Sequence, residues 1–195
     1  TVCEVAKAYN VPCPFSGNVK TVRQKHLMRQ ALDRAGLSNP KYKIAYNLED
    51  AKKAAQEIGY PLVLKPVDLA SSAFVKLIQT SSELQQAYHD LENFPLNFRD
   101  QERERALLIE EYICGEELSV ETVSNNGEIT VVGITDKSVT GSPYFIENGH
   151  MFPAKLKEDA KEKISDYVRN VLLATGYDHG IAHTEIKLTR DGPKV

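Results

Sequence analysis

Cysteine is scarce in this 195-residue sequence, which contains only Cys3, Cys13 and Cys114 and no CxxC pair. An odd number without that spacing argues against a disulfide framework and a zinc cluster, and it favours a reduced compartment. No apolar run approaches the roughly 18 residues of a membrane span, and the polar opening at residues 1–8 is unlike a signal peptide. We therefore expect a cytoplasmic protein that does not engage a membrane.

The sequence also has no excess of positive charge. Lysine and arginine number 24 against 27 aspartate and glutamate residues, which gives a formal net charge of −3. Without a basic field to hold a phosphate backbone, nucleic acid is not an expected partner. The 42% of hydrophobic and 26% of charged residues are typical of a globular chain of about one to two domains.

Several familiar motifs are absent as well. The sequence has no GxxxxGK[ST] loop and no GxGxxG after a strand, so P-loop and dinucleotide-binding folds lose most of their support. HExxH and GxSxG are also missing. The chemistry of this chain must therefore come from charged residues that a simple helix or strand pattern does not require.

Three helices are predicted in the first half of the chain, over residues 21–36, 47–59 and 80–91. Each begins with a capping pair, which in the first helix is Thr21 with Gln24, and continues with apolar residues at helical spacing. Residues 61–66 and 74–78 change to a strand pattern. Residues 93–105 are rich in charge without periodicity, and they predict a solvated linker between two lobes.

The second half of the chain is predicted to be mainly antiparallel sheet, with strands over residues 107–113, 118–123, 129–134 and 181–188 and a helix over 157–174. Asn126 and Gly127 supply the positive-φ residues of a hairpin. The expected class is α+β. We expect residues 1–20 to be the tail of a preceding domain, residues 21–106 to form one lobe and residues 107–195 to form a second.

Lys65 follows the apolar run 61–64 at the end of a predicted buried strand. An ammonium group beside a buried strand is costly unless an anion meets it, and a phosphate would serve. The alternative is a lysine that extends into solvent at the strand end. The residues alone leave both interpretations open.

Acidic residues cluster around the strand at residues 107–118. Glu110 and Glu111 would lie on opposite faces of it, and Glu117 follows closely. Three acids around one strand also fit an exposed sheet edge, and without other information that interpretation is the more common one.

The strand at residues 181–188 has one polar face, which presents His183, Glu185 and Lys187 together. Mg²⁺ prefers carboxylate oxygen and often takes only one or two protein carboxylates in addition to nucleotide phosphates, so Glu185 is a candidate ligand. A sheet with one solvated face is the alternative explanation.

Six segments of the sequence, in this order, resemble the ATP-grasp superfamily and, within it, carboxylate-amine ligases of the L-amino-acid ligase (dipeptide-forming) type. They are RQKHLMRQAL, GYPLVLKPVDLASS, LLIEEYICGEELSVET, GITDK, PYFIENGHMFPA and GIAHTEIKLTRDGPKV. The resemblance covers residues 25–195 and implies two α/β lobes that sandwich a nucleotide. It further implies ATP and Mg²⁺ as cofactors and an amide formed through an acyl phosphate from small-molecule carboxylate and amine substrates, with amino acids favoured.

The resemblance implies that Lys65 and Lys25 contact the ATP phosphates. Much of the superfamily carries a basic residue and glycine where this sequence has alanine and phenylalanine at residues 73–74. The phosphate loop would then hold the triphosphate through its backbone and the hydroxyls of Ser71 and Ser72, or would hold it more weakly.

The resemblance also implies groups for the rest of the nucleotide and for the metal. Glu110, with the backbone around Tyr112 and Ile113, would hold the adenine, and Glu117 would accept from the ribose hydroxyls. Glu185 would bind Mg²⁺.

His150 is the implied catalytic group, facing the amino-acid substrate or its acyl phosphate, and Glu147, Lys137 and His183 are implied in the same substrate region. The family normally continues past GPKV into a strand with a second metal-binding glutamate, an asparagine and a catalytic arginine. It is also preceded by a domain of about a hundred residues. We therefore expect a fragment, truncated at both ends and inactive alone.

Two alternatives stay open beside the amino-acid ligase. One is another ATP-grasp ligase, of purine-biosynthetic, carbamoyl-phosphate or biotin carboxylase type. The other is a nucleotide-binding domain that has lost turnover. A homodimer also stays open as an assembly.

Overall fold

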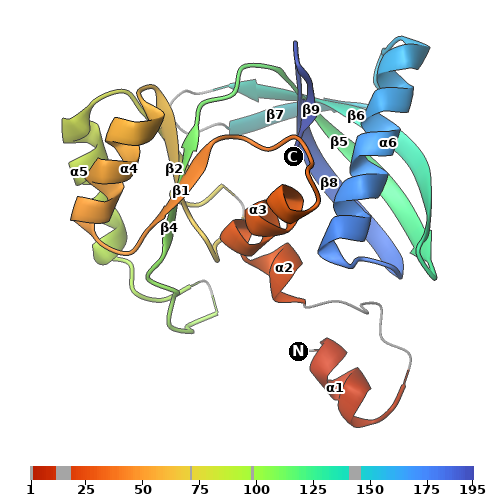
Figure 1. The fold of residues 1–195 in the computed structure, drawn as a ribbon, viewed down its shortest axis with the longest axis horizontal. Helices are drawn as coiled ribbons and strands as arrows, with labels where there is room; N and C mark the ends of the chain where they lie inside the picture. The colour runs from red at the N-terminus through yellow and green to blue at the C-terminus, as the bar shows by residue number, and fades with distance from the viewer. Residues whose placement is uncertain (1, 12–18, 71, 98, 141–145) are drawn as a thin grey trace.

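Two antiparallel sheets with their helices form the molecule, as the computed structural model shows (Figure 1). The structure describes residues 2–11, 19–70, 72–97, 99–140 and 146–195. Three helices come first in the chain: α1 (Val2–Ala8), α2 (Lys20–Arg23) and α3 (Lys25–Arg34). Helix α3 lies between the two sheets in Figure 1, so it is placed to contact both.

The first sheet has the strand order β1-β4-β2-β3 and is antiparallel throughout. Its strands are β1 (Tyr42–Ala45), β4 (Leu107–Glu111), β2 (Leu62–Pro66) and β3 (Lys76–Ile78). Helices α4 (Leu48–Ile58) and α5 (Ser81–Glu92) pack on it through a core of alanine and leucine side chains. The predicted caps form: the Asn47 side chain accepts from the Asp50 amide at 2.8 Å, and Thr80 accepts from the Glu83 amide at 3.2 Å.

The second sheet has the order β7-β6-β5-β8-β9. Its strands are β5 (Glu116–Asn125), β6 (Glu128–Thr140), β7 (Ile146–Met151), β8 (Gly180–Thr189) and β9 (Gly192–Lys194). Helix α6 (Glu158–Thr175) covers it, and Leu32 of α3 joins the same core. Asn126 and Gly127 have φ values of 50° and 81°, as the predicted hairpin requires.

The structure corrects the predicted start of the first long helix. Thr21 lies inside the short helix α2, and Gln24, with φ −109° and ψ 111°, separates α2 from α3. The predicted capping pair therefore does not form. The Gln24 side chain instead donates to Glu104, 80 residues further along the chain, at 2.5 Å, so a tertiary contact outcompetes the local cap.

The structure also corrects the predicted boundary between the lobes. The strand expected to open the second lobe at Leu107 is β4, which pairs with β1 and β2 inside the first sheet. Residues 93–105 consequently connect two elements of the same lobe and do not link the lobes. The change from one sheet to the other falls instead at residues 112–115, between β4 and β5.

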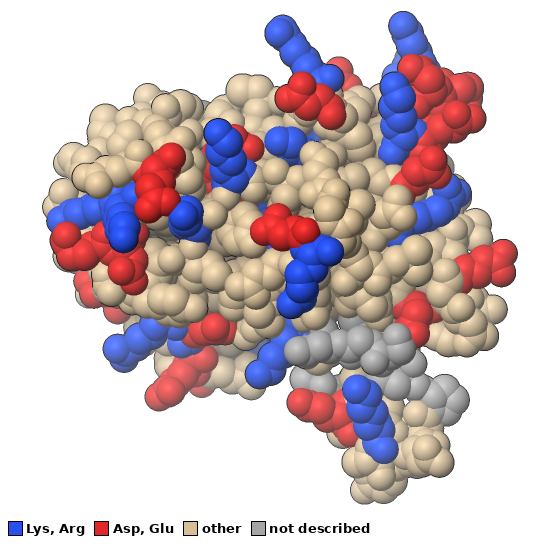
Figure 2. All heavy atoms as spheres, in the orientation of Figure 1, with Lys and Arg blue, Asp and Glu red and all other residues tan. Residues whose placement is uncertain are grey.

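Charged side chains of both signs are interspersed over the face of the molecule in Figure 2, without a broad patch of one sign. This arrangement agrees with the net charge of −3. Among the described residues, no helix is both long and apolar enough to cross a membrane.

Candidate functional site

A cleft of about 850 Å³ lies between the two sheets. The described residues that line it include most of those predicted to act, namely Lys25, Lys65, Ser72, Glu110, Tyr112, Ile113, Glu117, Lys137, Glu147, His183 and Glu185. Ser71 lies outside the described residues. His150 is described but is not among the lining residues. It lies on β7, with its Nε2 3.2 Å from Glu147 Oε2 and its side chain 56% exposed. The fold therefore brings distant segments of the chain to one cavity.

Glu110 is a buried carboxylate held between two cations. Its Oε2 lies 2.5 Å from Lys65 Nζ, and its Oε1 lies 2.5 Å from Arg29 Nε. Burial raises the pKa of Glu110, but Lys65 and Arg29 outweigh burial and bring the pKa down to about 2. The exposed-edge interpretation is wrong for this residue, because β4 lies between β1 and β2.

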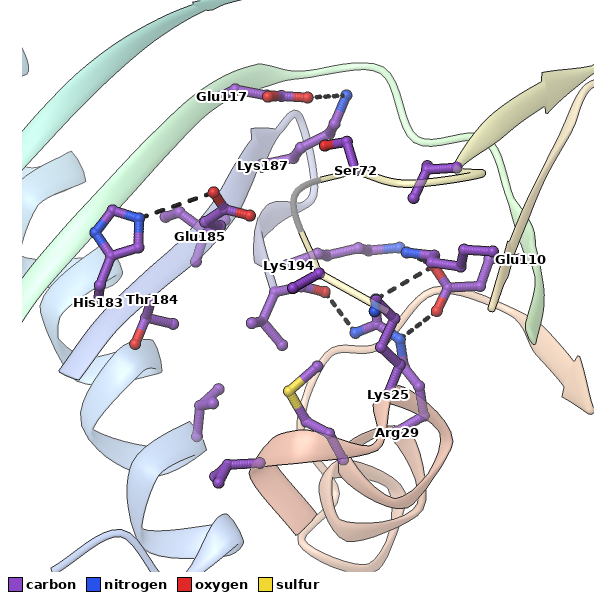
Figure 3. A pocket seen from close by; sticks show the side chains of 18 of the residues that line it. Lys25, Arg29, Ser72, Glu110, Glu117, His183, Thr184, Glu185, Lys187 and Lys194 are labelled. Atoms are coloured by element: carbon purple, nitrogen blue, oxygen red, sulfur yellow. Dashed lines mark hydrogen bonds and ion pairs between the residues drawn. The ribbon is translucent and has the colours of Figure 1, made fainter. Parts of the chain in front are cut away.

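Arg29 is a cleft residue that the sequence analysis missed. Its guanidinium donates to the carboxylate of Glu110 in the first sheet (Figure 3). It also donates from Nη1 to the carbonyl of Val195 at 2.5 Å, just after β9 of the second sheet. One buried side chain thus joins both sheets. A signal was present in the sequence: Arg29 follows Lys25 by four residues, so both lie on the same face of α3.

Lys25 and Lys65 bring two ammonium groups to one end of the cleft. Lys25 Nζ donates to the carbonyl of Leu69 at 2.5 Å. Burial and, to a smaller extent, the nearby charge of Lys65 together lower the pKa of Lys25 to about 8. An anion placed between these ammonium groups would relieve both effects, so this end of the cleft favours a phosphate.

The loop between β2 and β3 contains no lysine or arginine before Lys76. Phe74 has a φ of 57° and packs its ring against Phe94, with centroids 4.9 Å apart, so it serves the core of the first lobe. Ser72, also at positive φ, lines the cleft. The lysines Lys25 and Lys65 of the cleft therefore come from α3 and β2 and not from this loop.

The connection between the sheets, residues 112–115, closely approaches β8. A Cβ on Gly115 would lie 2.6 Å from the carbonyl oxygen of Leu188, so a larger residue cannot stand there without movement of the backbone. Beyond it, Glu117 Oε1 lies 3.0 Å from Lys187 Nζ, which is itself 5.5 Å from the centroid of the Tyr112 ring. The glycine therefore lets the connection and β8 form one wall of the cleft.

Lys137 connects two carboxylates on the face of the second sheet. Its Nζ donates to Glu147 Oε1 at 2.7 Å and to Glu185 Oε1 at 2.5 Å. Burial lowers the pKa of Lys137, but the hydrogen bonds to Glu147 and Glu185 outweigh burial, so its pKa is raised. The same contacts lower the pKa of Glu147. Glu147 therefore stays ionised at neutral pH.

His183 lies on the other side of Glu185. Its Nδ1 is 2.7 Å from Glu121 Oε1. Its Nε2 is 3.8 Å from Glu185 Oε1, and Figure 3 shows this second pair. The predicted alternation of β8 is confirmed, because His183 and Glu185 are exposed whereas Thr184 and Ile186 are buried.

Comparison with known proteins agrees with this arrangement. Residues 58–195 match the ATP-grasp domain family, so the chain belongs to that family. Alanine–anticapsin ligase of Bacillus amyloliquefaciens is 33% identical over 187 residues, covering 88% of this chain and 39% of that protein. The chain therefore spans about two fifths of the length of such curated relatives.

Solved structures show the same fold. The L-amino acid ligase from Bacillus licheniformis has a TM-score of 0.80 and 29% identity, over 99% of this chain and 44% of that one. The D-Ala:D-Ser ligase VanG from Enterococcus faecalis has a TM-score of 0.81 at 19% identity, over 100% of this chain and 57% of that one, which shows a shared fold. The predicted α+β ATP-grasp fold and the resemblance to L-amino-acid ligases are confirmed.

Proposed function

We propose that this chain is part of an ATP-dependent carboxylate-amine ligase that joins amino-acid substrates through an acyl phosphate. The observation that carries the proposal is the distribution of charge in the cleft. Lys25 and Lys65, from α3 and β2, line the same cleft as Glu117 and Glu185 of the second sheet, and Tyr112 and Ile113 of the connection between the sheets line it as well. The alanine–anticapsin ligase and L-amino acid ligase relatives favour amino acids as substrates.

The residues of the cleft have distinct tasks in this reaction. Lys25 and Lys65 bind the phosphates of ATP, and Glu117 accepts from the ribose hydroxyls. A substrate carboxylate oxygen attacks the γ-phosphorus, the bond to ADP breaks, and an acyl phosphate forms. Positioning and charge neutralisation supply most of the catalysis in such a phosphoryl transfer.

The acyl phosphate then reacts with the second substrate, the amine. The amine nitrogen attacks the activated carbonyl, phosphate leaves, and the nitrogen loses a proton to give the amide. His150, on β7 beside Glu147, is the proposed donor to the oxyanion that develops on the carbonyl oxygen. Closure of the lobes over the cleft would keep water from the acyl phosphate.

The residues of the cleft are compatible with a nucleotide-bound magnesium ion. Among the described residues, no group of three or more His, Cys, Asp or Glu side chains could hold a metal on its own. Mg²⁺ in nucleotide sites commonly takes one or two protein carboxylates plus phosphate oxygens, and Glu185 offers such a carboxylate in the cleft. When bound there, the ion would neutralise charge on the triphosphate.

The test of the proposed function is ATP-dependent phosphate release by the full-length protein across a panel of amino acids, singly and in pairs, with mass spectrometry of the products. A ligase of the proposed kind releases phosphate with particular pairs and yields a dipeptide of matching mass. Phosphate release with bicarbonate or a nucleotide precursor, but with no amino acid, would replace this proposal by another ATP-grasp ligase. Nucleotide binding without any turnover would indicate a non-catalytic domain.

Glu117 gives a specific prediction about nucleotide recognition. We expect Glu117→Gln to weaken the binding of ATP more than the binding of 2′,3′-dideoxy-ATP, by about 1 to 2 kcal/mol, because the analogue lacks the hydroxyls from which the carboxylate accepts. Calorimetry with both nucleotides measures the difference. Because Glu117 also pairs with Lys187 at 3.0 Å, Lys187→Met serves as the control for loss of that pair. Equal losses for the two nucleotides in the glutamine variant would assign Glu117 a purely structural role.

A further inference from the structure

Lys137 has an unusual position for a lysine in a cleft. Its side chain is only 3% exposed, whereas its two carboxylate partners, Glu147 and Glu185, are 42% and 62% exposed. The cation is therefore enclosed and the carboxylates face solvent. The carboxylates are therefore accessible to a ligand from the cleft, while the ammonium group that pairs with them is not.

The strand register shows how Lys137 reaches Glu185. Lys137 on β6 lies opposite Glu117 of β5, while Glu185 on β8 lies opposite Ser119 of the same strand. The ammonium thus crosses a whole strand, because β6 and β8 lie on either side of β5, about 9 to 10 Å apart. Ser119 is buried and small, and it leaves the path across β5 open. The strand register therefore places the Lys137 ammonium group within hydrogen-bond distance of Glu185.

We propose that Lys137 is a positioning residue that stands in for the divalent cation at Glu185. Its ammonium group pairs with this carboxylate at 2.5 Å and keeps it in place. When a cation and nucleotide arrive, the ammonium group gives up Glu185 and stays with Glu147. This inference rests on the proposed function, which assigns the cation to Glu185.

The contacts of Lys137 keep the free-energy cost of this exchange of partners small. A buried ammonium group without a carboxylate is strongly destabilising, but Lys137 has Glu147 at 2.7 Å as a second partner and does not become unpaired. Glu147 also lies 3.2 Å from His150. A cation at Glu185 would thereby change the contacts of Glu147 and His150 on β7, which the proposed function places near the substrate.

The experiment is a titration of the full-length protein with Mn²⁺ alone, followed by the electron paramagnetic resonance signal of the free ion. No nucleotide or amino acid is present. We expect Lys137→Met to bind Mn²⁺ about tenfold more tightly than the wild type, because the competing and repelling positive charge is gone. A lysine that merely supports the site would give the opposite sign. Mn²⁺ binding that is unchanged or weaker in Lys137→Met overturns the proposal.

Lys43→Met is the matched control. It removes a lysine on a strand of the first sheet that pairs with Glu57 at 2.6 Å, and Lys43 is not among the cleft residues. Its Mn²⁺ affinity should stay within about twofold of the wild type, because this charge is distant and screened. A gain equal to that of Lys137→Met would show a general charge effect and reject the specific role.

A second variant keeps the proposal testable if Lys137→Met does not fold. In Glu147→Gln, Glu185 is the one carboxylate among the described residues that still pairs with the ammonium group of Lys137. We therefore expect Mn²⁺ to bind at least about threefold more weakly than to the wild type. Unchanged or tighter binding contradicts the exchange. These titrations contain no substrate, so they are independent of whether the protein makes an amide, which product analysis decides separately.

Discussion

Replacing Glu110 by glutamine is expected to lower the free energy of unfolding by about 3 to 5 kcal/mol at pH 7, because the buried Arg29 and the partly buried Lys65 then lose their shared counter-charge. Arg29 and Lys65 each approach this carboxylate to 2.5 Å, and both Arg29 and Glu110 are buried. Urea denaturation of the wild type and the variant measures the difference.

The pH dependence of that difference follows from the lowered pKa of Glu110. Its pKa is about 2 in the folded protein, against 4.5 for an ordinary glutamate. The stabilisation is therefore fully present above about pH 4.5 and is lost as the pH falls towards 2, so the two proteins should converge over this range. A difference that stays constant from pH 7 to pH 2.5 would show that the loss does not arise from the ionised carboxylate.

Glu111→Gln is the control for this experiment. Glu111 is the next residue along β4, its side chain is 30% exposed, and its Oε1 lies 3.5 Å from Lys194 Nζ. Such a partly exposed pair contributes little, so we expect a loss below about 1 kcal/mol. An equal loss in the two variants would contradict the special role of the buried Arg29–Glu110–Lys65 group.

The second large effect concerns Glu185. In the full-length protein, Glu185→Ala is expected to reduce phosphate release by about two orders of magnitude or more, since the carboxylate proposed to hold the metal is removed. The melting temperature should change by no more than about 2 °C, because the side chain is 62% exposed and Lys137 keeps Glu147 as a partner. Activity measurements and thermal melts of the same preparations test both expectations.

A carboxylate on the same sheet but outside the cleft provides the comparison. Glu128 begins β6 and is exposed, and it is not among the cleft residues, so Glu128→Ala should retain full phosphate release. Normal turnover with alanine at position 185 would remove Glu185 from the metal site. A large drop in melting temperature would instead point to a structural role.

The sequence by itself determined the local structure and the candidate chemistry. Asn47 and Thr80 cap the helices that they were predicted to begin, and Asn126 with Gly127 forms the predicted hairpin, because these features depend on contacts within about four residues. The polar alternation along β8 also follows from its residue order. The ordered segments of the family resemblance identified the fold, and most of the site residues that the resemblance implied line the cleft.

Only the tertiary structure decided which segments meet. Residue order gives no sign that β4 pairs inside the first sheet, because strand pairing depends on contacts more than forty residues apart. For the same reason the sequence did not reveal that Arg29 meets Glu110 across 81 positions, or that Lys137 reaches Glu185 across 48. A buried charge needs a counter-charge, but the sequence does not say which one, and the packing of the two sheets makes that choice.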